Sequence, residues 1–253
     1  MDLRLGDSNA IVTGGRRGIG LAIARRLVEE GCNVSILSRE SAALAEPLAA
    51  LAHAGPGRAF GATVDLTDAD AYRSCLAHEI DRLGGLDVFV HNASGAAGFD
   101  EAGWERNLQT DIFGLTRAAD IVVPAMQARG GGSIVALSSI AAQEEFSNSN
   151  SFGPMKAAMT VFANNLAQRV AGDNIRVNIV SPGPVEYAGG SWERVRRTDP
   201  ERFASIVANM PRGRMGTEDE IADITVFLAS PRSSLVTSTN LVADGGYTKR
   251  YKF

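Results

Sequence analysis

The chain has 253 residues, of which 45% are hydrophobic and 21% charged, with a formal net charge of −4 and two cysteines, Cys32 and Cys75. Two unpatterned cysteines exclude a disulfide framework and a Cys-based zinc site and indicate a reducing compartment, so we expect a globular cytoplasmic protein. The acidic balance argues against a nucleic-acid partner, and no signal-peptide core or apolar run of roughly 20 residues indicates secretion or a membrane span.

Short β-branched runs alternate with helix-like stretches along the whole chain. The seven runs are residues 10–12, 34–37, 60–64, 88–90, 134–137, 177–180 and 241–243. Strands that alternate with helices form a parallel sheet, and near-continuous apolar strands indicate that helices cover both of its faces. The sequence therefore predicts a Rossmann-like, doubly wound α/β fold in a single domain over residues 1–253.

Helix boundaries are readable at several points. The first helix after the first strand places Ile19, Ile23, Leu27 and Val28 on one face, and Gly31 offers a left-handed stop. Thr217 and Glu220 form a capping-box pattern before an apolar run. Residues 183–214 show no regular period, so we expect a substrate-loop insertion there. A surface loop without a role in substrate binding fits the composition equally well.

Glycines crowd the turn between the first strand and the first helix, in the run Thr13-Gly14-Gly15-Arg16-Arg17-Gly18-Ile19-Gly20. Residues without Cβ permit a tight turn and let a pyrophosphate approach the backbone, while the helix N-terminus presents free N–H groups. The spacing is wider than the usual dinucleotide fingerprint, and a tight turn that binds nothing remains the alternative. The strand before it and the helix after it favour a dinucleotide site.

The end of the second strand distinguishes the two nicotinamide dinucleotides. A carboxylate there binds the 2′-hydroxyl of NAD, whereas a basic residue accommodates the 2′-phosphate of NADP. The sequence has Ser38-Arg39 at this point. Because Arg39 and Arg17 can both form charge-assisted bonds to a phosphate, we expect NADP(H) rather than NAD(H).

The Thr-Gly-x-x-x-Gly-Ile-Gly turn resembles that of the short-chain dehydrogenase/reductase family, and further motifs extend the resemblance over nearly the whole chain. These motifs are Asp65-Leu66, His91-Asn92-Ala93-Ser94-Gly95, Ser138-Ser139, Arg176-Val177-Asn178, Ser181-Pro182-Gly183-Pro184-Val185 and Asp244-Gly245-Gly246. The resemblance implies a homo-oligomer, a tetramer or dimer. It also implies cofactor contacts from Gly14, Arg16, Arg17, Gly18, Ile19, Gly20, Ser38, Arg39, Asp65, Leu66, Asn92, Ala93, Ser94, Lys156, Pro182, Gly183 and Val185.

The family's catalytic group is Asn, Ser, Tyr and Lys, and this sequence departs from it at two positions. Ser139 and Lys156 match the family's Ser and Lys, but Phe152 stands at the Tyr position and Asp111 at the Asn position. Dienoyl-CoA reductases resemble the chain in both departures. The resemblance thus implies an atypical active site of Ser139, Phe152, Lys156 and Asp111.

The phenyl ring of Phe152 cannot donate the proton that carbonyl reduction requires. Because a positioned acid typically contributes about 10²–10⁴-fold, we expect ordinary ketone reduction to be impaired unless another donor replaces the tyrosine. Lys156 is expected to bind the nicotinamide ribose still, and Ser139 to polarise a carbonyl. A carboxylate within about 4–6 Å would favour the charged lysine, so Asp111 forms either a structural ion pair or part of an altered proton relay.

Two aromatic residues are candidate substrate contacts alongside Ser139. Tyr187 stands in the loop after Pro182, where the family commonly has Thr, and either reaches the substrate or packs under the insertion. Trp192 lies within the insertion. No pattern of His, Cys or carboxylate residues suggests a metal site.

The function predicted from the sequence is that of an NADP(H)-dependent oxidoreductase acting on a small molecule, either a carbonyl or alcohol or a conjugated enone or enoyl substrate. The missing tyrosine allows that the chain is a divergent or an inactivated member. Two alternatives stay open: a non-redox enzyme of dehydratase, isomerase or retro-aldol type, and a non-catalytic NADP-binding protein.

Overall fold

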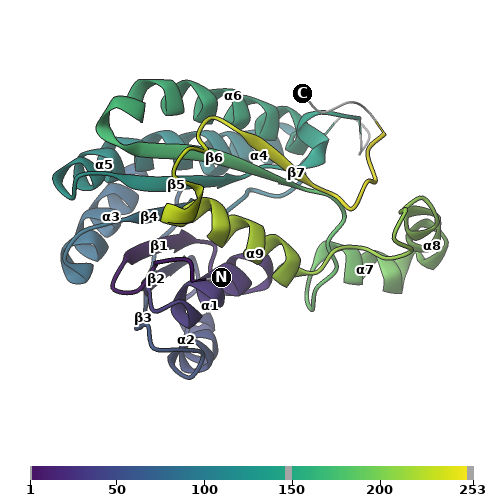
Figure 1. The fold of residues 1–253 in the computed structure, drawn as a ribbon. Coiled ribbons are helices and arrows are strands. Elements are labelled where there is room, and N and C mark those ends of the chain that lie inside the picture. Colours follow the sequence, from purple (N-terminus) through teal and green to yellow (C-terminus); the bar gives the residue numbers. More distant parts are fainter. Residues whose placement is uncertain (1, 146–149, 250–253) are drawn as a thin grey trace.

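A computed structural model describes residues 2–145 and 150–249 of the chain. Its centre is a seven-stranded, wholly parallel sheet in the order β3-β2-β1-β4-β5-β6-β7 (Figure 1). The strands are β1 (Asn9–Thr13), β2 (Asn33–Ser38), β3 (Ala59–Thr63), β4 (Val88–His91), β5 (Gly132–Leu137), β6 (Ile175–Pro182) and β7 (Asn240–Ala243). The predicted doubly wound fold and all seven strands are confirmed.

Helices cover both faces of the sheet (Figure 1). One face carries α1 (Gly18–Glu29), α2 (Ala45–Ala52) and α9 (Glu218–Ala229). The other face carries α3 (Ala69–Leu83), α5 (Phe113–Ala128) and α6 (Phe152–Val170). The shorter helices are α4 (Glu101–Asn107), the π-helical turn η2 (Leu108–Ile112), α7 (Ser191–Thr198) and α8 (Pro200–Ala208), with 3₁₀ turns at Ser41–Ala43, Ile140–Ala142, Ala171–Asp173 and Pro231–Ser233.

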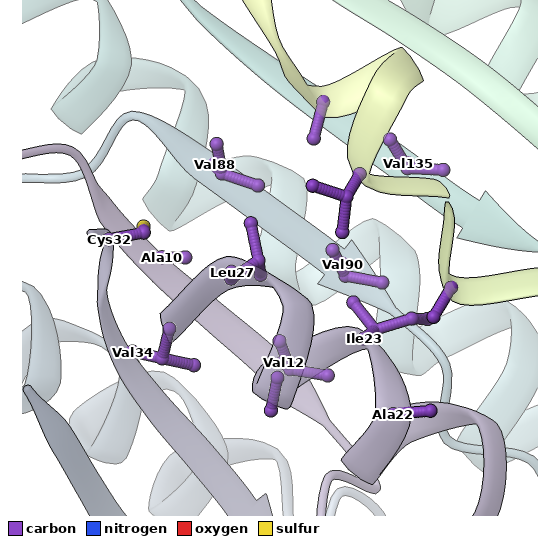
Figure 2. Close-up of a cluster of buried hydrophobic side chains, with 14 of the residues drawn as sticks. Ala10, Val12, Ala22, Ile23, Leu27, Cys32, Val34, Val88, Val90 and Val135 are labelled. Atoms are coloured by element: carbon purple, nitrogen blue, oxygen red, sulfur yellow. The ribbon is translucent and has the colours of Figure 1, made fainter. Parts of the chain in front are cut away.

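Each face of the sheet has its own apolar core. On the α1 side, Val12, Val34 and Val90 pack against Ile23 and Leu27 (Figure 2). Alternate residues of the same strands point to the other face, where the second core lies among α3, α5 and α6. Burial of strands on both faces explains why their sequences are nearly continuous apolar runs.

The predicted helix signals are present at both ends of the chain. Helix α1 ends at Glu29, and Gly31 has the left-handed φ of 88° that favours glycine. Thr217 and Glu220 form the predicted capping box of α9. No helix within residues 2–145 and 150–249 is long and apolar enough to cross a membrane.

The segment after β6 is more regular than the sequence indicates. Instead of an irregular stretch, it contains the two consecutive helices α7 and α8, with Asp199 accepting the N–H of Arg202 at the start of α8. Each helix is shorter than three turns, so its period is easily missed among the glycines, prolines and arginines of this segment. Both helices lie beyond the carboxyl end of β6 (Figure 1).

Candidate active site

The strand order reverses between β1 and β4, and the carboxyl ends of these two strands frame a crevice at the edge of the sheet. Asn92, directly after β4, closes this crevice against the glycine-rich turn after β1. Its Nδ2 donates to the carbonyl oxygens of Thr13 and Gly14, both at 3.1 Å. In return, Thr13 Oγ1 accepts the backbone N–H groups of Asn92 and Ala93, both at 3.0 Å. These four bonds fix the two strand ends to each other.

The glycine-rich turn is packed too tightly for larger residues. Gly14 has a left-handed φ of 65°, and a Cβ on Gly20 would lie 2.4 Å from the carbonyl oxygen of Gly14. Helix α1 then begins without a side-chain cap, so its first N–H groups are available to an anion. A close-packed glycine turn beside an uncapped helix N-terminus fits the pyrophosphate of a dinucleotide.

A cavity of about 960 Å³ lies at this edge of the sheet. Most of the predicted cofactor residues line it: Gly14, Arg16, Arg17, Ile19, Gly20, Ser38, Arg39, Asp65, Leu66, Asn92, Ala93, Ser94, Lys156 and Pro182. We call the part around the glycine-rich turn and the end of β2 its nucleotide end. The part around Lys156 and Phe152 is its catalytic end.

Three predicted cofactor residues are not among those that line the cavity. Gly18 lies beneath the ring of Tyr187, and a Cβ at this position would be 2.4 Å from Cε2 of that ring. Gly183 packs against Asp244. Val185 is buried in the core and pairs with Gly216. All three residues pack closely against their neighbours, and their predicted cofactor contacts stay predictions.

The nucleotide end carries three arginines in different states. Arg16 pairs with Glu40 at 3.4 Å, and Nη1 of Arg17 donates to the carbonyl oxygen of Gly189 at 2.8 Å. Arg39 is exposed at the end of β2 and makes no ion pair or side-chain hydrogen bond within the described residues. Ser38 precedes Arg39, and Glu40, which lines the same cavity, follows it.

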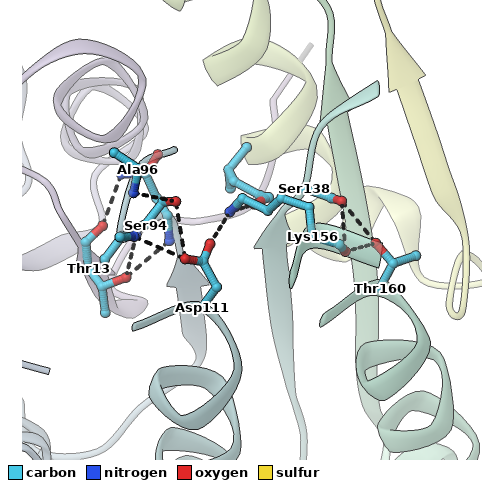
Figure 3. A network of polar contacts seen from close by, with 11 residues as sticks. Thr13, Ser94, Ala96, Asp111, Ser138, Lys156 and Thr160 are labelled. Atoms are coloured by element: carbon cyan, nitrogen blue, oxygen red, sulfur yellow. Dashed lines mark hydrogen bonds and ion pairs between the residues drawn. The ribbon is translucent and has the colours of Figure 1, made fainter. Parts of the chain in front are cut away.

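At the catalytic end, Lys156 and Asp111 form a buried ion pair (Figure 3). Lys156 Nζ lies 2.8 Å from Asp111 Oδ1, and the two side chains are 3% and 0% exposed. The ammonium also donates to the carbonyl oxygen of Leu137 at 2.7 Å. Asp111 Oδ2 accepts the Ser94 hydroxyl at 3.2 Å and the Gly95 N–H at 3.0 Å. Because Ser94 lines the cavity, a hydrogen-bonded chain connects the buried pair with the cleft.

Helix geometry explains how Asp111 reaches the lysine. Asp111 lies in the π-helical turn η2, which interrupts one continuous helical run from α4 into α5. A π-turn contains one more residue than an α-turn and re-aims the side chains within it. The sequence shows no sign of this turn. It therefore does not distinguish a structural ion pair of Asp111 and Lys156 from a proton relay.

The side chain of Phe152 lines the cavity one helical turn before Lys156 on α6. Its ring centroid lies 5.8 Å from Lys156 Nζ, close enough for a cation–π contact. Phe152, at the position that the resemblance assigns to the family's tyrosine, therefore stabilises the ammonium but offers no proton.

Of the two adjacent serines after β5, one is fully engaged. The Ser138 hydroxyl bonds with Thr160 Oγ1 at 2.9 Å and donates to the Lys156 carbonyl at 3.3 Å. Within the described residues, Ser139 Oγ accepts the N–H of Ala141 at 3.2 Å and has no other hydrogen bond, so its proton is available to another group. Ser139 is half-buried and adjoins the cavity through Ser138 rather than lining it.

His91, at the end of β4, is a buried neighbour of the ion pair. The ring is fully buried, and neither nitrogen makes a well-formed hydrogen bond within the described residues. Burial, assisted by the nearby Lys156 charge, lowers the pKa of His91 from 6.5 to about 4. The imidazole is therefore neutral near pH 7.

The two aromatic substrate candidates occupy different places. Tyr187 lines the cavity, with its ring against Gly18 and Gly190. Trp192 is half-buried on α7 and is not among the lining residues. The face of α7 that does line the cavity is polar, and sequence reasoning missed it. Its residues are Ser191, Glu193, Arg194, Arg196 and Arg197.

Helix α7 brings Arg194, Arg196 and Arg197 to the cavity. Within the part of the chain that the structure describes, no group of three or more His, Cys, Asp or Glu side chains could hold a metal ion.

The fold and the cavity together define a dinucleotide-binding α/β protein, and comparisons with known proteins identify its family. A family model described as enoyl-(acyl carrier protein) reductase matches residues 14–248. Isoepoxydon dehydrogenase patN of Penicillium expansum is 32% identical over 243 residues, which cover 94% of each chain. The 3-oxoacyl-[acyl-carrier-protein] reductase FabG of Chlamydia pneumoniae is 32% identical, over 98% of this chain and 100% of its own.

Among solved structures, L-sorbose reductase of Gluconobacter frateurii, complexed with NADPH and L-sorbose, superposes with a TM-score of 0.91 at 27% identity, covering 99% of this chain and 100% of its own. The chain belongs to the short-chain dehydrogenase/reductase family. The relatives named here are dehydrogenases and reductases, so the chain is an oxidoreductase of this family's type.

Proposed function

We propose that the protein is an NADP(H)-dependent oxidoreductase that acts on a carbonyl or alcohol, or on a conjugated enone or enoyl group. One observation carries the proposal: a single cavity joins the glycine-rich turn, the exposed Arg39 after β2 and the buried Lys156. The NADPH complex of the structurally similar L-sorbose reductase supports the choice of cofactor.

Different residues of the nucleotide end bind different parts of NADP(H). The uncapped N-terminus of α1 and the glycine turn bind the pyrophosphate, while Arg39 and Arg17 bind the 2′-phosphate. To bind the 2′-phosphate, Arg17 either releases the Gly189 carbonyl or divides its five N–H donors between that carbonyl and the phosphate. Asp65 and Leu66 lie beside the adenine, and Lys156 bonds the ribose next to the nicotinamide. When bound, the cofactor supplies hydride-transfer chemistry.

The residues of the catalytic end orient the substrate and move the proton. Ser139 donates its free O–H to the substrate oxygen, and Tyr187 borders the space for the rest of the substrate. Phe152 supplies no proton, so the proton comes from the Lys156 ammonium and is restored through Asp111 and the Ser94 hydroxyl, which reaches the cleft. A relay through a buried pair is slower than a tyrosine in direct contact, and ketone reduction is accordingly impaired.

Enoyl and enone substrates suit this site better than simple ketones. A resonance-stabilised product anion can take its proton later and from solvent, so the missing hydroxyl matters less. The description of the matching family model, an enoyl reductase, agrees with this preference. Assembly into a homotetramer or dimer and a cytoplasmic location stay predictions from the sequence.

Titration calorimetry with NADPH and NADH tests the proposal. NADPH is expected to bind about tenfold more tightly than NADH, since one charge-assisted bond is worth at least this factor. Arg39→Gln should remove the difference, whereas Arg169→Gln, at an exposed position of α6 outside the cavity, should leave it intact. Equally weak binding of the two dinucleotides contradicts the cofactor choice. Absence of turnover with every carbonyl and enone tried, despite tight NADPH binding, favours a non-catalytic binding protein.

A further inference from the structure

The polar face of α7 presents arginines to the cavity that the cofactor's own binding groups do not require. Arg194 and Arg197 stand one helical turn apart, so their side chains lie on the same side of the helix. Both are exposed, and neither guanidinium has an ion pair or hydrogen bond among the residues that the structure describes. Between them, Arg196 has a different role, because it pairs with Glu186 at 3.0 Å and lies over the ring of Phe203.

The backbone of helix α7, which carries these two arginines, is anchored to neighbouring segments. The turn before the helix is fixed by the Gly189 N–H, which donates to Glu193 at 2.6 Å, and by the Arg17 bond to the Gly189 carbonyl. On its other side, the Arg196 pair with Glu186 ties the helix to the segment after β6. The two free arginines are therefore presented by a braced helix rather than by a loose loop.

Helix α7 follows a different strand from Arg39, while the turn before it contacts Arg17 of the nucleotide end. Arg39 follows β2, whereas α7 follows β6, and β1, β4 and β5 lie between these two strands. In Figure 1, α7 lies beyond the carboxyl end of β6, and its residues line the same cavity as Lys156 and Phe152. The pyrophosphate already has the uncapped N-terminus of α1.

The charge of the cavity lining is positive overall. Seven cationic side chains line it against three carboxylates, in a chain whose formal charge is −4. The carboxylates are already engaged, since Glu40 pairs with Arg16, Glu193 accepts the Gly189 N–H and Asp65 accepts the Thr67 N–H. A cleft with this imbalance concentrates anions.

We propose that Arg194 and Arg197 form a subsite for an anionic group of the substrate, a phosphate or carboxylate carried at the end remote from the reacting carbon. The inference rests on the proposed oxidoreductase function and names the substrate class of that site. Guanidinium groups bind both anions through paired N–H bonds, so these two arginines select charged over neutral substrates.

Calorimetry on the full-length protein saturated with NADP⁺ tests the subsite with two matched pairs of probes. Dihydroxyacetone phosphate is compared with dihydroxyacetone, and 4-oxopentanoate with its methyl ester. At least one charged probe is expected to bind about tenfold more tightly than its neutral partner. The pair that shows the difference tells whether the site takes a phosphate or a carboxylate.

Variants separate the subsite from the general positive charge of the protein. The double change Arg194→Gln with Arg197→Gln should weaken binding of the charged probe by about tenfold or more and leave the neutral probe unchanged. The double change Arg169→Gln with Arg202→Gln, which removes the same two charges from exposed positions on α6 and α8, should change neither. Thermal unfolding of each variant verifies that it is folded.

Three outcomes overturn the inference. One is equal binding of the charged and neutral probes, or no binding of either anion at millimolar concentration. The second is a double variant that binds the charged probe as well as the wild type. The third is a double variant whose NADPH affinity falls about tenfold, because the arginines would then belong to the cofactor. A wild-type protein that binds no NADP(H) at all instead contradicts the proposed function, so the two failures are distinguishable.

Discussion

At the nucleotide end of the cavity, Thr13 and Asn92 join two strand ends through four hydrogen bonds around a glycine turn. At the catalytic end, Asp111 and Lys156 form a buried ion pair, and the ring of Phe152, which the resemblance places at the family's tyrosine position, lies near the lysine. The first region contains most of the predicted cofactor residues. The second contains Lys156 and a serine, beside a carboxylate and a phenyl ring.

The difference shows that binding and chemistry can change separately on one scaffold. Pyrophosphate recognition depends on backbone shape, which few substitutions preserve. Proton transfer depends on one donor of suitable acidity, and a different donor, or a substrate that needs none, can replace it. Four experiments test the contrast between the two ends.

The largest effect is expected from Lys156→Met. Removal of one partner from a buried ion pair leaves an uncompensated charge and costs about 3–5 kcal/mol. Urea unfolding at pH 7 should show this loss, and the double variant Lys156→Met with Asp111→Asn should recover most of it. If the single variant is as stable as the wild type, the carboxylate does not depend on the lysine for its burial.

His91→Asn should change how stability depends on pH. The pKa of His91 is lowered to about 4 in the folded protein from 6.5, so the unfolded state binds the proton first. Stability attributable to His91 is therefore complete above pH 6.5 and lost as the pH falls towards 4, by up to about 3 kcal/mol. Unfolding curves across this window should be flatter for His91→Asn. His53→Asn, at an exposed position, should not flatten them.

Thr13→Val probes the nucleotide end. It removes the acceptor of two backbone N–H groups, and such a loss costs about 1–3 kcal/mol. Chemical denaturation should show that cost, and calorimetry should show weaker NADPH binding because the glycine turn loses its support. Thr225→Val is the matched control, since the Thr225 hydroxyl donates only to the carbonyl of Ile221 within its own helix. Unchanged NADPH affinity in Thr13→Val would show that the turn holds its shape without Asn92.

Phe152→Tyr tests whether a proton donor is missing at the catalytic end. A tyrosine one turn before Lys156 restores the family's proton donor and should raise ketone reduction at least tenfold, equivalent to about 1.4 kcal/mol in activation free energy. NADPH consumption with a panel of ketones measures the gain, and Phe152→Leu should show none. No gain with any ketone would indicate that the acid lies elsewhere or that the reaction is not a reduction.

Strand positions were predictable because a doubly covered sheet requires apolar strands, and such runs are visible in any single sequence. The sixth strand is longer than predicted. The sequence predicts residues 177–180, whereas β6 covers Ile175–Pro182 and includes the polar residue Arg176. The Arg176 guanidinium donates to the carbonyls of Leu228, Ala229 and Ser230 at the end of α9, contacts that only the tertiary structure creates.

The identity of most site residues was also predictable, because motif and strand order place them at the same edge of the sheet. Their mutual geometry was not. The 2.8 Å contact between Asp111 and Lys156 depends on the π-turn. The cavity-facing side of α7 depends on a short helix whose period the surrounding glycines conceal.

The π-turn around Asp111 also affects which insertions and deletions the chain can tolerate. Loss of one residue between Leu108 and Ile112 would turn the bulge into ordinary α-helix while α4 and α5 keep their packing faces. The scaffold would survive such a deletion, but the carboxylate would rotate away from the lysine. Length variation in this short segment is thus a route by which a descendant could lose or regain the charged pair without disturbing the rest of the molecule.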